Sequence, residues 1–220
     1  MKKINIAVDG PAGSGKSATM KIVAQKLNYH FFDTGLMYRA FTWFANYKKI
    51  NFNENSEIVN LLKEFDFKIN SDRVYVNNID VTNELSSNEI IKNINKITIN
   101  KEVRDWMVTE QRNLVQGKGF VVVGRDIGSV VLKDAELKIY LDCSVESRSL
   151  RRFKQNQEQN ITPNIIEDIK KAIQNRDQSD MQREQGPLVK TQDAILVDNS
   201  NLTINQAVDL ILQAVDKKIN

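Results

Sequence analysis

Residues 4–17, INIAVDGPAGSGKS, decide the fold because they place a glycine-rich loop between a buried strand and a helix. The apolar, β-branched run Ile4–Asp9 predicts a buried strand, which gives way to a loop at Gly10 and Pro11. Apolar residues recur at helical spacing from Lys16 to Leu27, which predicts a helix directly after the loop. Residues 4–27 therefore predict the opening strand, loop and helix of an α/β protein.

The loop itself matches the pattern G-x-x-x-x-G-K-[ST] at every fixed position. Glycines let such a loop curl so that backbone N–H groups point at phosphate oxygens, and the following helix N-terminus adds positive partial charge. We expect Lys16 to reach the β- and γ-phosphates and Ser17 to bind Mg²⁺. The motif predicts a nucleoside triphosphate site, and its expected binding residues are Gly10, Pro11, Ala12, Gly13, Ser14, Gly15, Lys16, Ser17 and Ala18.

Short apolar runs continue to alternate with helical patterns along the chain. Five buried strands separated by helices indicate a parallel sheet covered on both faces. The expected fold class is α/β, a three-layer P-loop NTPase fold with a five-stranded parallel sheet. We expect strands at 4–9, 29–32, 120–123, 137–141 and 194–197, and helices at 16–27, 36–47 and 202–218.

The stretch 48–100 breaks this alternation. Its segments Phe65–Ile69, Val74–Val76 and Ile79–Val81 alternate with period two around an Asn-Asn pair, which predicts a small antiparallel meander. We therefore expect 48–100 to be an inserted subdomain between the core segments 1–47 and 101–220. The chain is polar from Arg148 to Asp180, where we expect helix with a break near Pro163, and we expect a short helical lid at about 148–164.

Composition narrows the class of protein. Among 220 residues, 41% are hydrophobic and 27% charged, which is typical of a packed globular protein. A net charge of +3 gives no broad surface for nucleic acid, and one Cys with one His excludes a disulfide framework and a zinc site built from N and S ligands. No stretch reaches the roughly 18 apolar residues of a membrane span. We expect a cytoplasmic monomer without nucleic-acid or membrane partners.

Polar residues follow two further predicted strands. Thr34 and Arg39 come after the second strand, and Arg125 and Asp126 follow the third. The carboxyl ends of strands line the ligand crevice of an open parallel sheet, so these residues are candidates for the same cleft as the loop. The alternatives are an ordinary helix N-cap at Asp33 or Thr34 and a structural ion pair at Arg125 and Asp126.

Two charged stripes lie on predicted helices. Arg148, Arg151 and Arg152 share one helical stretch, and opposite a phosphate loop they could neutralise a transferring phosphoryl group. A solvated basic face is the alternative. The series Arg176, Asp180 and Arg183 has spacing i, i+4, i+7, which is also common in surface salt bridges.

Taken together, these motifs resemble the bacterial cytidylate kinase family over nearly the whole chain. Many families share the phosphate loop, whereas Asp33–Gly35 and Gly124–Gly128, with Val74–Thr82 between them, are far more specific. The resemblance implies transfer of phosphate from ATP with Mg²⁺ to CMP or dCMP, with 48–100 as the nucleoside-monophosphate-binding insert. The resembling segments are 6–17, 33–40, 74–82, 124–128, 137–142, 176–177 and 186–188.

The resemblance also implies roles for individual residues. Ser129 and Ala18 are mild departures, since the family usually has Thr at the first position and often Ser or Thr at the second. The implied ATP site also includes Arg151, and the implied catalytic residues are Lys16, Arg125, Asp126, Arg148 and Arg152. The implied CMP residues are Thr34, Arg39, Arg125 and Arg183 at the phosphate, Arg104 and Asp126 at the cytosine, and Arg176 and Asp180 at the sugar. Asn95 occupies the position where the family has a small hydroxyl residue near the base.

This mechanism requires no histidine, because a phosphate monoester with a second pKa of about 6 is already mostly ionised at neutral pH. Catalysis then consists of positioning and charge neutralisation. Two alternatives remain from the residues alone. One is a P-loop kinase for another small acceptor such as UMP or a metabolite, and the other is an NTPase switch that hydrolyses its nucleotide without an acceptor.

Overall fold

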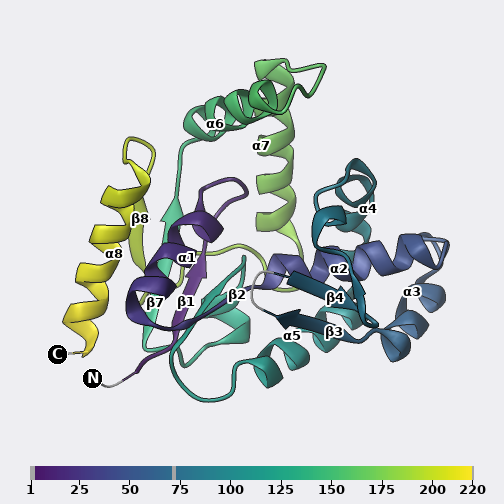
Figure 1. Ribbon diagram of the computed structural model, residues 1–220, viewed down its shortest axis with the longest axis horizontal. Helices are drawn as coiled ribbons and strands as arrows, with labels where there is room; N and C mark the ends of the chain where they lie inside the picture. Colours follow the sequence, from purple (N-terminus) through teal and green to yellow (C-terminus); the bar gives the residue numbers. More distant parts are fainter. Residues whose placement is uncertain (1–2, 71–72, 220) are drawn as a thin grey trace. The chain divides into compact units, whose positions relative to one another are not determined.

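The computed structural model describes residues 3–70 and 73–219 (Figure 1). The chain divides into two compact units, one of Met1–Phe32 with Gly117–Asn220 and one of Asp33–Gln116. The insert expected at 48–100 lies inside the second unit, whose limits are wider on both sides.

The first unit is built on a five-stranded sheet of order β2-β6-β1-β7-β8. The central strand β1 runs parallel to β6 on one side, where Ile6 pairs with Val121, and parallel to β7 on the other, where Ile6 pairs with Leu137. This topology confirms the predicted α/β class. The strands are β1 (Ile6–Asp9), β2 (His30–Asp33), β6 (Phe120–Val123), β7 (Leu137–Asp142) and β8 (Ile195–Asp198).

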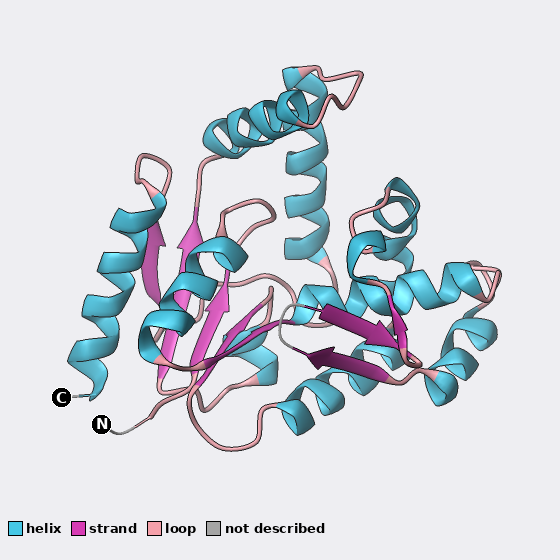
Figure 2. Ribbon diagram, in the orientation of Figure 1, coloured by secondary structure: helices cyan, strands magenta, loops and turns pink. Residues whose placement is uncertain are grey.

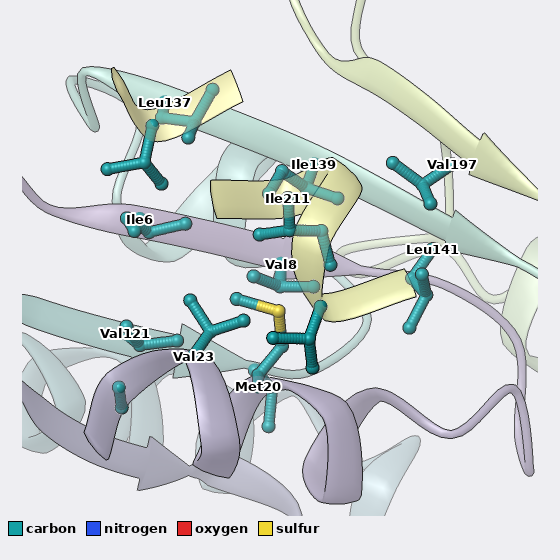
Figure 3. Close-up of a cluster of buried hydrophobic side chains, with 14 of the residues drawn as sticks. Ile6, Val8, Met20, Val23, Val121, Leu137, Ile139, Leu141, Val197 and Ile211 are labelled. Atoms are coloured by element: carbon teal, nitrogen blue, oxygen red, sulfur yellow. The ribbon is translucent and has the colours of Figure 1, made fainter. Parts of the chain in front are cut away.

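The core of this unit lies between the sheet and two helices, α1 (Lys16–Leu27) and α8 (Ile204–Ile219). Figure 3 shows Met20 and Val23 of α1 and Ile211 of α8 against strand residues of the sheet. Not all five strands are buried as predicted, because most residues of the edge strands β2 and β8 are partly or fully exposed. Each edge strand has only one neighbour, which leaves part of its apolar run uncovered.

Two further helices of the first unit form an arm. Helices α6 (Val145–Glu158) and α7 (Ile166–Gln182) pack against each other and extend beyond the carboxyl ends of the strands (Figures 1 and 2). The Ser144 side chain accepts a hydrogen bond from the Ser147 N–H and caps α6. The break predicted near Pro163 is confirmed, since the helices are separated by residues 159–165.

The second unit combines helices with a three-stranded antiparallel sheet of order β3-β4-β5. Asn77 and Asn78 form the turn between β4 and β5 with φ of 48° and 65°, a left-handed conformation that asparagine tolerates. The predicted meander is therefore confirmed. The elements are α2 (Thr34–Tyr47), α3 (Asn55–Leu61), β3 (Phe67–Asn70), β4 (Arg73–Val76), β5 (Ile79–Asp80), α4 (Asn88–Thr98) and α5 (Lys101–Leu114).

No helix within residues 3–70 and 73–219 is long and apolar enough to cross a membrane.

Candidate active site

The phosphate-binding loop between β1 and α1 depends on glycine at two points. A Cβ on Gly10 would lie 2.2 Å from the Leu141 carbonyl oxygen, so only glycine lets the loop start this close to β7. Gly15 has φ of 87°, a left-handed conformation directly before the first residue of α1. The sequence motif therefore reflects backbone geometry that other residues would strain.

Lys16 is buried and folds back over this loop. Its Nζ donates to the carbonyl oxygens of Gly10 at 2.7 Å and Pro11 at 2.8 Å, and lies 3.3 Å from Ser14 Oγ. The loop thus wraps around a single ammonium group, which brings positive charge to the place where the motif predicts phosphate oxygens.

Two side chains from distant parts of the chain fix further carbonyl groups of the loop. Arg148 NH1 donates to the Ala12 carbonyl at 3.0 Å, and Asn199 Nδ2 donates to the Ser14 carbonyl at 2.7 Å. Because a planar trans peptide directs a carbonyl and the next N–H to opposite sides, each contact also turns the following N–H away from the donor. Arg148 and Asn199 therefore set the direction of loop N–H groups.

The three arginines predicted on α6 have different surroundings. Arg148 is 4% exposed, and Arg151 donates to Asn199 Oδ1 at 3.2 Å and to the Asn199 carbonyl at 2.8 Å. Arg152 is exposed and donates to Gln155 on its own helix. Arg148 therefore contacts the loop directly, and Arg151 contacts Asn199, which in turn binds the loop. Within the described part of the chain, Arg152 forms a hydrogen bond only with a residue of its own helix.

A second cluster joins the end of β6 to the end of α7. Arg125 Nε lies 2.8 Å from Asp180 Oδ2, and Arg183 NH2 lies 3.3 Å from Asp126 Oδ1. Arg183 NH1 is also 3.8 Å from Asp180 Oδ1, so positive and negative groups alternate. All four side chains are mostly buried, which strengthens their interactions. These residues, predicted as part of the acceptor set, do lie together.

Arg183 is held further by its Nε, which donates to the Gly186 carbonyl at 2.6 Å. The Asp180 carbonyl accepts from the Leu188 N–H at 2.8 Å, which ties the segment after α7 back to the helix. Arg176 is half-buried on α7. The backbone thus fixes the end of α7, and with it the charged cluster.

Asp9, at the end of β1, links the loop strand to the segment after Asp126. Its carboxylate accepts from the N–H groups of Ile127 at 2.7 Å and Gly128 at 2.8 Å. Burial raises the pKa of Asp9 to about 6, although these two hydrogen bonds and the nearby Lys16 lower it. The buried Asp9 carboxylate therefore fixes the segment after β6, which carries Arg125 and Asp126 of the charged cluster.

We expect Asp9→Asn to change how stability depends on pH. The folded pKa of about 6 exceeds the ordinary aspartate pKa of 3.8, so the unfolding free energy that Asp9 contributes falls as pH rises from about 4 to 6 and is constant above that. The amplitude is about 3 kcal/mol. Urea unfolding from pH 4 to 8 should show this decline as the difference between wild type and Asp9→Asn. A pH-independent difference would contradict the assignment.

The remaining predicted site residues lie in the Asp33–Gln116 unit. Thr34 is buried at the first residue of α2, and Arg39 NH1 donates to the Leu85 carbonyl at 2.9 Å. Arg104 is buried, with its guanidinium 5.9 Å from the centre of the Tyr38 ring.

Two positions in this unit have other surroundings. Asn95 is exposed on α4, and its carbonyl accepts from the Thr98 hydroxyl at 3.2 Å. The alternative of a helix cap is confirmed for Asp33, whose side chain accepts from the Gly35 N–H at 2.9 Å.

Sequence reasoning assigned no role to three residues that hold the site together: Asp9, Asp177 and Asn199. Asp177 Oδ2 lies 2.7 Å from Arg148 NH2. Asp9 is the last residue of β1, and Asn199 directly follows β8. The rule that polar residues at carboxyl ends of parallel strands face the ligand crevice could have found both of these.

Ser17 is the predicted metal-binding residue. Among residues 3–70 and 73–219, no three His, Cys, Asp or Glu side chains are grouped so that they could hold a metal ion. Ser17 is exposed at the start of α1 and offers a hydroxyl oxygen. Mg²⁺ bound with substrate phosphates keeps several waters and needs few protein ligands, so one hydroxyl fits an ion that arrives with the nucleotide.

Comparison with known proteins gives one consistent result. The family model for cytidylate kinase matches residues 6–217. A cytidylate kinase from Mycoplasma capricolum subsp. capricolum is 52% identical over 215 residues, which cover 98% of this chain and 97% of that one. A cytidylate kinase from Mesoplasma florum is 47% identical over 214 residues, covering 97% and 96%.

Among solved structures, an uncharacterized protein from Eubacterium ventriosum aligns with a TM-score of 0.53 at 12% identity, covering 97% of this chain and 99% of that one. At that identity the likeness concerns the fold alone. The family model covers most of this chain, and the relatives match it over nearly its full length. This chain belongs to the cytidylate kinase family.

Proposed function

We propose that this protein transfers the γ-phosphoryl group of ATP to CMP or dCMP, using the phosphate loop for the donor and the charged cluster for the acceptor. The observation that carries the proposal is the cytidylate kinase match over residues 6–217, which includes the complete loop. An ATP-dependent nucleoside monophosphate kinase needs a site for each of two polyanions, and the first unit has two separate groups of cations.

On the donor side, Lys16 and the loop N–H groups would bind the β- and γ-phosphates. Mg²⁺ enters as part of the ATP substrate, with the Ser17 hydroxyl as its protein ligand. Bound there, the ion would offset negative charge on the phosphates. Arg151 supports the loop through Asn199, and we propose that Arg151 and Arg152 add positive charge on the arm.

On the acceptor side, Arg125 and Arg183 would hold the CMP phosphate, and Asp126 would accept a hydrogen bond from the cytosine N4 amino group. Arg176 and Asp180 would bind the sugar hydroxyls. From the Asp33–Gln116 unit, we propose Thr34 and Arg39 for the phosphate, with Arg104 and Asn95 for the base. The burial of Asp126 supports this proposal, because an amino donor is best recognised by an acceptor held in place.

The reaction requires no general base. The attacking oxygen belongs to a phosphate whose second pKa is about 6, so it is mostly ionised at neutral pH. Repulsion between the two nucleotides is then the main barrier to approach, and arginines at the acceptor lower it. The proposed site residues thus serve to position the two nucleotides or to neutralise the charge of their phosphates.

Water must be excluded during transfer, because otherwise ATP would be hydrolysed. We propose that the segment 148–164, which includes α6 from Arg148 onward and most of the turn to α7, acts as the lid. We also propose that the protein works in the cytoplasm, where ATP is available as the donor. We propose that it is a monomer.

A substrate panel tests the function. ADP release is measured with ATP·Mg²⁺ and separately CMP, dCMP, UMP, AMP, GMP or no acceptor, and the nucleotide products are separated by chromatography. We expect ADP formation to require CMP or dCMP, with CDP or dCDP as the product. Preference for another acceptor would refute the cytosine assignment, and turnover without an acceptor would favour an NTPase switch.

A further inference from the structure

We propose that Asp177 is a positioning residue: it holds Arg148 against the phosphate loop and thereby couples acceptor binding on α7 to the shape of the donor site. This inference rests on the proposed function for the identity of the acceptor. Its structural basis lies entirely within the first unit of the chain.

The contacts of Arg148 join three segments that are far apart in the sequence. Nε donates to the Cys143 carbonyl after β7 at 2.8 Å, and NH1 donates to the Ala12 carbonyl in the loop at 3.0 Å. NH2 forms an ion pair of 2.7 Å with Asp177 on α7. Because Arg148 is 4% exposed, this guanidinium is a fixed bridge and not a solvated surface charge.

The Arg148–Asp177 pair is poorly explained by stability alone. A buried ion pair is often no more stabilising than apolar residues of similar volume. In addition, Asp177 Oδ1 is buried without a hydrogen-bond partner in the described part of the chain, which adds a desolvation cost. A role in holding Arg148 at a chosen place accounts for a pair that stability does not require.

The bridge links the two substrate sites because of where Asp177 lies. On α7 it directly follows Arg176 and precedes Asp180 by three residues, and both are proposed sugar-binding residues. A helix moves as a unit, so a shift of α7 on acceptor binding moves the Asp177 carboxylate. Arg148 transmits that shift to the Ala12 carbonyl and hence to the direction of the next N–H group.

Linkage makes the coupling measurable. If CMP changes the affinity for the donor, the donor changes the affinity for CMP by the same factor. Titration calorimetry gives the Kd of a non-hydrolysable ATP analogue with Mg²⁺, with and without saturating CMP. For wild type we expect CMP to tighten analogue binding about 5-fold or more. For Asp177→Asn, which keeps the shape but loses the charge, we expect the ratio of the Kd without CMP to the Kd with CMP to approach one.

The matched control is Gln178→Ala, because Gln178 is the exposed neighbour of Asp177 on the same helix. It should keep the wild-type ratio. Thermal unfolding is recorded for each variant, since a merely structural Asp177 would lower Tm and leave the ratio unchanged. That result would overturn the proposal. If Asp177→Asn fails to fold, Arg148→Lys replaces it, because an ammonium group cannot reproduce the three-way bridge, and the same loss of ratio is expected.

Failure of this inference is distinguishable from failure of the proposed function. A wild-type ratio of one, with CDP formation intact, overturns the coupling but leaves the kinase assignment. Absence of CDP formation by wild type refutes the function through the substrate panel. A ratio that falls toward one in Asp177→Asn and persists in Gln178→Ala supports the positioning role.

Discussion

Lys16→Ala is expected to lower kcat for CDP formation by about 10²–10³-fold while the protein still folds. Lys16 Nζ already lies within 3 Å of two loop carbonyls, at 2.7 and 2.8 Å, so its charge is fixed before any nucleotide binds. On nucleotide binding the ammonium group would exchange these contacts for phosphate oxygens, where it would offset the negative charge that develops in transfer. Its loss therefore affects the chemical step more than overall stability.

The measurement is steady-state ADP release with saturating ATP·Mg²⁺ and CMP, together with thermal unfolding. Lys26→Ala is the matched control, because Lys26 is an exposed lysine near the end of the same helix. We expect Lys26→Ala to retain wild-type turnover. Unchanged turnover in Lys16→Ala would refute the assignment of the phosphate loop.

The parts of the site that the sequence predicts well are those encoded locally. Residues 10–17 specify their own backbone, since the glycines, the lysine and the helix start all lie within one short segment. The predicted helix at 16–27 and strand at 120–123 agree with the structure to the residue. Local spacing was also sufficient for the turn at Asn77 and Asn78.

Spacing on a helix is less informative about surroundings. It placed Arg148, Arg151 and Arg152 on one stretch, but burial separates them: Arg148 is 4% exposed and Arg152 lies in solvent. Which arginine becomes buried depends on what packs against α6, and that partner is α7. Helical periodicity gives the direction of a side chain without identifying the element that faces it.

Contacts between distant segments were the hardest to predict. Asn199 and Ser14 are 185 positions apart, and Arg148 and Ala12 are 136 apart. An asparagine after a strand or an aspartate on a polar helix gives no local signal of its partner. Only the order of strands in the sheet brings these residues to the same loop, so their roles follow from topology.

The second large effect is expected for Arg183→Ala, which should lower kcat/KM for CMP by about 10²-fold or more and leave ATP-analogue affinity without CMP nearly unchanged. Arg183 is the cation between Asp126 and Asp180, at 3.3 and 3.8 Å. Its removal takes away a proposed phosphate ligand and leaves two carboxylates without their shared partner. The donor loop has other contacts, from Lys16, Arg148 and Asn199.

Stability must be separated from substrate binding in this variant. Removing one partner of a buried pair costs about 3 to 5 kcal/mol, so Arg183→Ala should also unfold at lower temperature. Adding Asp126→Asn removes one stranded charge and should recover part of that stability. It should not restore CMP phosphorylation, because the phosphate still lacks Arg183 and the cytosine loses the proposed Asp126 carboxylate. Lys190→Ala, an exposed lysine beyond α7, is the control for both readouts. An equal loss of ATP-analogue affinity in Arg183→Ala would contradict its place at the acceptor, since it would mean that the cluster serves the donor phosphates.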